Sequence, residues 1–136
     1  MKYFLGIDSG TSGVKAIVVG EDGSSAGIGY KELDLLTEKP MWAEQDPREW
    51  WTACKYAIRE AVAKSGVGKE IGGIGISGQM LGSTLLDKNN EVLGNCITWL
   101  DQRSIEEVNE IINRAGMDYL LEKTSNIPLT GYWGPK

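Results

Sequence analysis

The segment from Gly6 to Lys15 has the residue types of a phosphate-binding turn. It reads Gly-Ile-Asp-Ser-Gly-Thr-Ser-Gly-Val-Lys, so a carboxylate ends an apolar stretch and a turn rich in glycine and hydroxyl groups follows. Glycines allow several backbone N–H groups to point into one concavity, where phosphate oxygens bind. The residues expected to contact phosphate are Gly10, Thr11, Ser12, Gly13 and Lys15. The same composition also suits a plain β-hairpin turn, and from this segment alone both interpretations stay open.

Asp8 is the carboxylate that would lie beside a bound phosphate. Mg²⁺ keeps several waters and binds one or two carboxylates together with phosphate oxygens, so we expect Asp8 to hold this ion through water. The chain contains no histidine, which excludes a Ser-His-Asp triad, a histidine base and the commonest zinc ligand. The segment matches neither a Walker A loop nor a Rossmann fingerprint. Any chemistry must therefore rely on carboxylates, hydroxyls, lysines or a bound cation.

The composition is that of an ordinary globular protein with a single core. The chain has 136 residues, of which 41% are hydrophobic and 24% charged, as is usual for one modest domain. The net charge of -5 argues against general affinity for nucleic acid or anionic lipid, since both need a basic face. No apolar run approaches the roughly 20 residues of a membrane span. The apolar stretch at the N-terminus is too short for a signal peptide, because an acidic residue follows it at Asp8. We therefore expect a cytoplasmic protein without nucleic-acid or membrane partners.

Three strands and a helix would position the turn. Apolar and β-branched residues over 3–7, 14–19 and 26–36 alternate with turn residues, which predicts an antiparallel meander. The helix would begin at the N-cap Asp46, with Pro47 and a capping-box Glu49, and end at Gly66. The side chains expected to pack along it recur at helical spacing: Trp50, Trp51, Cys54, Ala57, Ile58, Ala61 and Val62.

The rest of the chain alternates strands and helices. We expect a buried strand over 71–76, a strand over 83–86 with its turn at 88–91, and extended chain over 92–99. A capping box of Ser104 and Glu107 would open a helix that ends at Gly116, and a short helix would follow over 118–122. Together these elements predict an α/β domain with a mixed sheet. Residues 131–136 contain no closing element, which predicts an incomplete domain.

Four segments, in order, resemble the FGGY carbohydrate kinases and most closely their xylulokinase members. They are Gly-Ile-Asp-Ser-Gly-Thr-Ser at 6–12, Met-Trp-Ala-Glu-Gln-Asp-Pro at 41–47, Ile-Gly-Ile-Ser-Gly-Gln-Met at 74–80 and Trp-Leu-Asp-Gln-Arg at 99–103. The resemblance implies a ribonuclease-H-like mixed sheet with flanking helices, as in the actin and sugar-kinase superfamily. It also implies that residues 1–136 form the N-terminal part of the family's N-terminal domain, without that domain's C-terminal portion and without the second lobe.

The function that the resemblance implies is ATP-dependent phosphorylation of a sugar hydroxyl, with a pentulose such as xylulose as the acceptor. Asp8 resembles the catalytic aspartate that organises Mg²⁺ and the transferred phosphate. The residues that resemble the sugar contacts or the wall of the sugar pocket are Gln79, Met80, Leu81, Trp99, Asp101 and Arg103. The family's catalytic base, a second aspartate, has no match here. We therefore expect the chain alone to be inactive, and to self-associate or pair with the missing half.

Several alternatives stay open at this point. Xylulokinases typically carry histidine where this chain has Leu81, so another pentulose, a polyol or a sugar acid could be the substrate. Trp99 could belong to a core, Asp101 could cap a turn with Arg103 as its surface partner, and Met80 could fill a gap. A non-sugar ATPase of the actin-like superfamily lacks the segments at 79–80 and 99–103. A non-catalytic folding or interaction module would bind neither sugar nor nucleotide.

Overall fold

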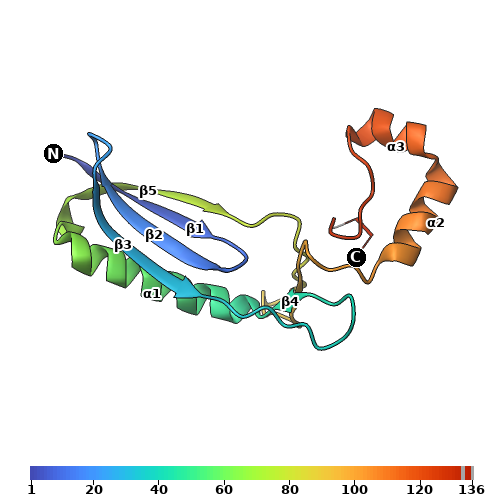
Figure 1. The fold of residues 1–136 in the computed structure, drawn as a ribbon, viewed down its shortest axis with the longest axis horizontal. Coiled ribbons are helices and arrows are strands. Elements are labelled where there is room, and N and C mark those ends of the chain that lie inside the picture. Colours follow the sequence, from blue (N-terminus) through green and yellow to red (C-terminus); the bar gives the residue numbers. More distant parts are fainter. Residues whose placement is uncertain (133, 136) are drawn as a thin grey trace. The chain divides into compact units, whose positions relative to one another are not determined.

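In the computed structural model, the chain divides into two compact units (Figure 1). The first unit contains residues 1–35 and 46–79, and the second contains residues 36–45 and 80–136. The structure describes residues 1–132, 134 and 135, so the predicted lack of a closing element at 131–136 lies partly outside the described residues.

The first unit is built on a four-stranded mixed sheet. Its strands are β1 (Tyr3–Ser9), β2 (Gly13–Gly20), β3 (Ser25–Glu32) and β5 (Ile71–Gly78), in the spatial order β3-β2-β1-β5. β2 pairs antiparallel with β1 and β3, and β5 pairs parallel with β1. The predicted meander and mixed sheet are thereby confirmed. The third strand ends at Glu32 and not at residue 36, because its ladder partner β2 begins at Gly13, the residue paired with Glu32.

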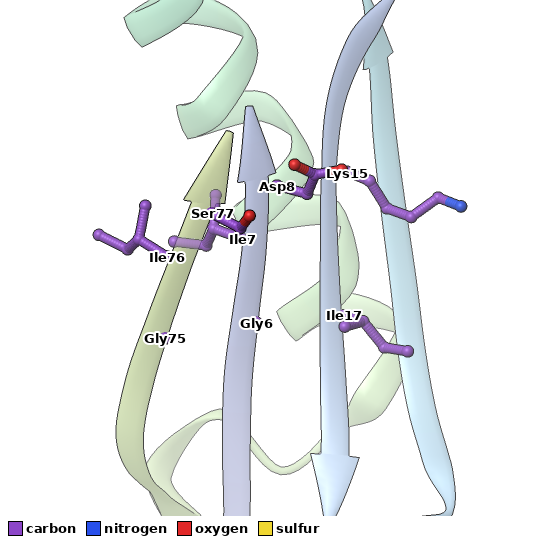
Figure 2. Close-up of a pocket in the computed structure, with 8 residues that line it drawn as sticks. All are labelled: Gly6, Ile7, Asp8, Lys15, Ile17, Gly75, Ile76 and Ser77. Carbon is purple, nitrogen blue, oxygen red and sulfur yellow. The ribbon is translucent and has the colours of Figure 1, made fainter. Parts of the chain in front are cut away.

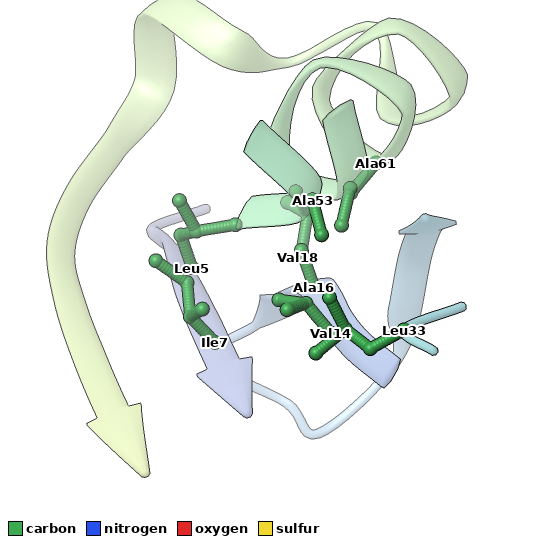
Figure 3. Close-up of a cluster of buried hydrophobic side chains, with 9 residues drawn as sticks. Leu5, Ile7, Val14, Ala16, Val18, Leu33, Ala53 and Ala61 are labelled. Atoms are coloured by element: carbon green, nitrogen blue, oxygen red, sulfur yellow. The ribbon is translucent and has the colours of Figure 1, made fainter. Parts of the chain in front are cut away.

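One face of this sheet is covered by α1 (Pro47–Ser65), which the short turn η1 (Gly68–Glu70) connects to β5. Asp46 caps the helix by accepting the Arg48 N–H at 2.9 Å, and Gly66 ends it with φ 68°, as predicted. Figure 3 shows the core between helix and sheet, where small helix residues face β-branched and leucine side chains. Its buried members are Leu5, Ile7, Val14, Ala16, Val18, Leu33, Ala53, Ala57 and Ala61.

The helix lies unusually close to β3 because the facing positions of the strand are glycines. A Cβ added at Gly29 would lie 2.0 Å from the Ala57 carbonyl oxygen, and one at Gly27 would lie 2.3 Å from that of Ala61. Trp50 packs against the core, whereas Trp51 is exposed, so its predicted packing is wrong. Helical spacing places residue 51 next to the apolar stripe, but the face that approaches the sheet closely carries the fully buried alanines, and Trp51 lies outside it.

The second unit has little regular sheet. Its strands are β4 (Glu44–Gln45) and β6 (Cys96–Ile97), which pair antiparallel. The predicted strand over 83–86 is wrong, because Ser83 and Leu86 each form only an isolated bridge. The stretch 92–99, expected to be extended, contains one such bridge at Val92 and the short strand β6. The turn at 88–91 is confirmed, since the Asp87 carboxylate accepts the N–H groups of Asn89 and Glu91, each at 2.8 Å.

Two helices follow, α2 (Ile105–Ala115) and α3 (Met117–Thr124), joined at Gly116. Both were predicted, but the capping box at Ser104 is wrong. The Ser104 hydroxyl makes no cap hydrogen bond and donates instead to the Thr130 carbonyl at 3.1 Å, because this buried side chain faces the segment that follows α3. None of the helices in the described part of the chain is long and apolar enough to cross a membrane.

Candidate functional site

The face of the sheet opposite α1 carries a row of four polar side chains. Side chains alternate between faces along a strand, and since Leu5 and Ile7 face the helix, Asp8 faces the other way. The ladder pairs Asp8 with Lys15 on β2 and with Ser77 on β5, and it pairs Lys15 with Tyr30 on β3. One row across all four strands therefore holds a hydroxyl, a carboxylate, an ammonium group and a phenol.

An open hollow of about 410 Å³ lies over three of these side chains, those of Ser77, Asp8 and Lys15. Figure 2 shows Asp8 between Ser77 and Lys15, with the Lys15 side chain extending away from Asp8 towards β3. Among the described residues no ion pair joins Lys15 to Asp8, so the two charges stand side by side without neutralising each other. Glycines at Gly6 and Gly75 form the floor next to Asp8. The arrangement therefore provides the Lys15 ammonium group for an anionic ligand and the Asp8 carboxylate for a hydrated cation.

The loop of residues 9–13, between β1 and β2, is tied down by its neighbours. The Gly10 N–H donates to the Gly13 carbonyl (3.1 Å), which closes a tight turn. At the β5 side, the Gln79 N–H donates to the Ser9 carbonyl (2.9 Å) and the Thr11 hydroxyl donates to the Gln79 side-chain oxygen (3.3 Å). Gln79, predicted to touch the sugar, therefore contacts the predicted phosphate turn.

The second unit contains a separate cavity of about 390 Å³. It is lined by Leu81, Trp99, Gln102, Leu129, Thr130, Gly131 and Tyr132. Trp99 is 45% exposed, so this residue is not part of a core. Thr130 donates its hydroxyl to the Gln102 side-chain oxygen at 2.7 Å. Leu81 reaches the cavity from a left-handed backbone conformation with φ 67°, which is uncommon for a bulky residue. The cavity thus combines an aromatic face with hydroxyl and amide groups.

Asp101 and Arg103 do not line this cavity. They form an ionic cluster in which the Asp101 carboxylate is buried and Arg103 is half-buried. The Arg103 guanidinium donates to the Asp101 carboxylate at 2.7–2.9 Å and to Glu44 at 2.6 Å, and its Cζ lies 3.6 Å from the centroid of the Trp42 ring. Asp101 also accepts the Ala43 N–H at 2.8 Å. The cluster ties the 41–45 segment to the 98–104 segment, which carries Trp99.

The titration of this pair reflects both burial and contacts. Burial acts to raise the pKa of Asp101, but the hydrogen bonds from Arg103 and from the Ala43 N–H outweigh it and hold this pKa below its ordinary value. The hydrogen bond to Asp101 raises the pKa of Arg103, against a smaller opposing effect of burial. Both groups are therefore charged at neutral pH. The Asp101 carboxylate also accepts the Arg103 backbone N–H at 3.0 Å, so the turn alternative fits Asp101, whereas Arg103 is half-buried and not a fully exposed surface partner.

The fit of Mg²⁺ to Asp8 depends on the chemistry of this one carboxylate. The described residues contain no group of three or more His, Cys, Asp or Glu side chains that could hold a metal ion. An ion that keeps its waters and uses one carboxylate together with phosphate oxygens needs no such group. Asp8, exposed next to the 9–13 loop, fits that mode.

Sequence reasoning missed several residues of these two sites. Ser77 and Tyr30 belong to the Asp8 row, and the strand register could have found them once the order of the strands was known. Tyr132 and Thr130 line the cavity near Trp99 but lie far from it in the sequence, in a segment without periodicity. Met80, which was predicted to contact sugar, is exposed and does not line the cavity.

Comparison with known proteins gives matches along the whole chain. A model of the FGGY family of carbohydrate kinases, N-terminal domain, matches residues 3–136. The xylulose kinase of Bacillus subtilis (strain 168) is 41% identical over 137 residues, which cover 100% of this chain and 27% of the relative. The L-xylulose/3-keto-L-gulonate kinase of Escherichia coli (strain K12) is 42% identical over 130 residues, covering 95% of this chain and 25% of the relative.

A solved structure gives the same result. The crystal structure of a xyloylose kinase from Brucella ovis matches with a TM-score of 0.88 at 42% identity, over 98% of this chain and 28% of that chain. The predicted fold class, a mixed sheet of the actin and sugar-kinase type present as a partial domain, is thereby confirmed. The chain spans about a quarter of the length of these relatives.

Proposed function

The chain belongs to the FGGY family of carbohydrate kinases, and we propose that it is the N-terminal part of an enzyme that transfers the γ-phosphate of ATP to a sugar hydroxyl. The observation that carries the proposal is the Asp8–Lys15 pair in one row beside the 9–13 loop, over an open hollow. Phosphoryl transfer depends on positioning and on charges that face the transferred group. A sugar kinase that uses ATP would work in the cytoplasm, which is where we place it.

Each residue of the row has a role in this proposal. Lys15, together with backbone N–H groups and the hydroxyls of Thr11 and Ser12, would bind phosphate oxygens, with Gly10 and Gly13 keeping the turn tight. Asp8 would hold Mg²⁺ through water, and this ion, when bound, would neutralise charge on the phosphates. The catalytic base and the adenosine site would be supplied outside these 136 residues. We therefore propose that the chain alone is inactive.

We propose that the acceptor is a sugar bound in the second unit against Trp99. An aromatic face suits the C–H groups of a sugar, and the Thr130 and Gln102 side chains supply hydrogen-bonding groups to its hydroxyls. Leu81 would add a contact from the segment after Gln79, while Asp101 and Arg103 would hold the wall in place. A pentulose such as xylulose is the class we favour, because the sequence relatives named above act on xylulose by their names.

A chimeric enzyme tests the function directly. The segment of the B. subtilis xylulose kinase that matches this chain is replaced by residues 1–136, and ATP-dependent phosphorylation of xylulose, L-xylulose, 3-keto-L-gulonate and glycerol is measured. We expect the chimera to phosphorylate one pentulose and the chain alone to phosphorylate none. Asp8→Asn should reduce kcat by at least about 100-fold, the magnitude typical of removing one group that stabilises transferring charge. A folded chimera that phosphorylates no acceptor, with the parent enzyme active, would contradict the proposal.

The same chimera addresses the choice of sugar. Leu81→His restores a hydrogen-bonding side chain at a position that lines the cavity. One neutral hydrogen bond contributes about 1 kcal/mol, so we expect KM for xylulose to fall about fivefold. An unchanged KM would show that residue 81 does not contribute to recognition of the sugar.

We also propose that this chain pairs with the part of the family's fold that it lacks. β5 is an edge strand, and its side chains Ile74 and Ile76 are exposed although they lie on the face that α1 covers farther along the sheet. Apolar side chains at a sheet edge favour association. Co-expression with the remaining segment of the B. subtilis enzyme, followed by co-purification through a tag on this chain, checks the pairing. Two segments that never co-purify would contradict it.

A further inference from the structure

Tyr30 contacts the 9–13 loop although it lies on a different strand. It sits on β3, an edge strand of the sheet, in ladder register with Lys15. Its own N–H, on the edge of the sheet, donates to the Glu60 carboxylate of α1 at 3.0 Å. This contact anchors the backbone of Tyr30 to the helix, so the phenol is presented from a fixed position.

The phenol makes one specific contact with the loop. The Tyr30 hydroxyl donates to the Ser12 carbonyl at 3.0 Å, and the Leu33 N–H donates to the same oxygen at 3.1 Å. A Cβ at Gly13 would lie 2.4 Å from the Tyr30 hydroxyl oxygen. Only glycine at position 13 therefore allows the phenol to reach the carbonyl. The contact between the Tyr30 hydroxyl and the Ser12 carbonyl therefore depends on both Gly13 and Tyr30.

Two donors on one carbonyl fix the orientation of a peptide group. Because the peptide is planar and trans, the Ser12 carbonyl and the Gly13 N–H point in opposite directions. Holding the carbonyl towards β3 therefore turns the N–H away from β3. Loops that bind anions work by presenting N–H groups, and a carbonyl oxygen rotated into the same space would repel the anion. The Tyr30 hydroxyl opposes that rotation.

We propose that Tyr30 is a positioning residue for phosphate binding: through the Ser12 carbonyl it holds the 9–13 loop in the orientation that receives the phosphates of the nucleotide. The proposal rests on the proposed kinase function. Tyr30 itself need not touch the nucleotide, since its hydroxyl is already engaged by the loop. It therefore acts on the binding of the phosphate donor and not on the binding of the sugar.

Tyr30→Phe tests the proposal by removing one oxygen atom. In the chimera we expect an apparent KM for ATP about fivefold higher, which corresponds to about 1 kcal/mol, with KM for the sugar and kcat changed by less than about twofold. Tyr56→Phe is the matched control, because Tyr56 is exposed on α1 and its ring lies under the Lys31 ammonium group of β3. It should leave all three parameters unchanged.

A second measurement needs no activity. Amide hydrogen exchange is followed in the 136-residue chain without nucleotide, where Tyr30→Phe should accelerate exchange in the 9–13 loop and leave β1 and β2 unchanged. Equal KM values for ATP in Tyr30→Phe and the parent chimera would overturn the proposal, and so would accelerated exchange across the whole sheet, which indicates a merely structural role. An inactive parent chimera would instead remove the kinase function on which the proposal rests.

Discussion

The strongest single perturbation of the second unit should be Arg103→Met. Arg103 is 21% exposed and contacts Asp101, which is 0% exposed, as well as Glu44 and the Trp42 ring. Methionine keeps much of the volume and the flexible stem but removes all of the guanidinium hydrogen bonds. The Asp101 carboxylate would then stay buried with only the backbone N–H groups of Ala43 and Arg103 as partners.

The loss in free energy of unfolding follows from these contacts. Removing one partner of a buried ion pair typically costs about 3–5 kcal/mol, because the other charge is left without compensation. The remaining N–H donors and the residual exposure of Arg103 favour the lower end, about 3 kcal/mol. With a slope of about 2 kcal/mol per M of urea, the midpoint of unfolding should fall by about 1.5 M. Arg103→Lys keeps the charge but not the fork of donors, and we expect about half of that loss.

Urea unfolding followed by tryptophan fluorescence measures this directly, since Trp42 lies under the guanidinium. Arg114→Met is the matched control: this residue pairs with Glu110 four positions away on α2 and is 79% exposed. Exposed pairs of that kind contribute about 0.3–0.5 kcal/mol. If Arg103→Met costs no more than Arg114→Met, the cluster does not hold the second unit together and the reasoning is refuted.

Three further predictions concern stability. Gly29→Ala should lower the free energy of unfolding by about 3 kcal/mol, since its Cβ would meet the Ala57 carbonyl at 2.0 Å. Gly75→Ala, with no atom within 4 Å of its Cβ, should leave that free energy almost unchanged in the same urea experiment. Equal losses in the two variants would contradict the close helix packing. Thr11→Val and Gln79→Ala should be less than additive by about 1 kcal/mol, with Thr11→Ser as the variant that keeps the hydroxyl; full additivity would show that the contact carries no energy. The pKa of Asp101 is lowered in the folded chain, so the ionised carboxylate stabilises the fold above its ordinary pKa of 3.8, and this stabilisation is lost as the pH falls through the lowered pKa. The difference in free energy of unfolding between the parent and Asp101→Asn should therefore shrink below about pH 4. A difference that stays constant with pH would contradict this prediction.

Local rules were enough to predict most of the first unit from the sequence. Asp46 and Gly66 lie at the ends of a strongly periodic segment, so the helix and its caps could be predicted from neighbouring residues alone. The three-strand meander follows in the same way from β-branched runs and short turns. Trp51 was misjudged because periodicity gives the apolar side of a helix but not how closely that side approaches the sheet, which Gly27 and Gly29 decide.

The second unit was harder to predict because long-range contacts determine it. The Ser104 hydroxyl has a capping-box sequence around it, yet it bonds to Thr130, 26 residues away. The ladder between β4 and β6 is too short for its residues to show the alternating pattern by which a strand is recognised in a sequence. For the same reason the cavity residues Thr130 and Tyr132 were missed, while Trp99 and Leu81 were found through the resemblance to a family and not through spacing.

The ionic cluster of the second unit has a cost that stability alone does not explain. A buried ion pair is often no more stable than apolar side chains of the same volume, because desolvation offsets the attraction. What the pair adds is geometry: the fork of Arg103 bonds to both Asp101 and Glu44, and Asp101 bonds to the backbone at Ala43. Apolar side chains could fill the space without fixing the register between the 41–45 and 98–104 segments. Under the proposed function, the cluster would set the position of Trp99, and the hydrogen bonds on Ser12 and Gln79 would set the position of the 9–13 loop.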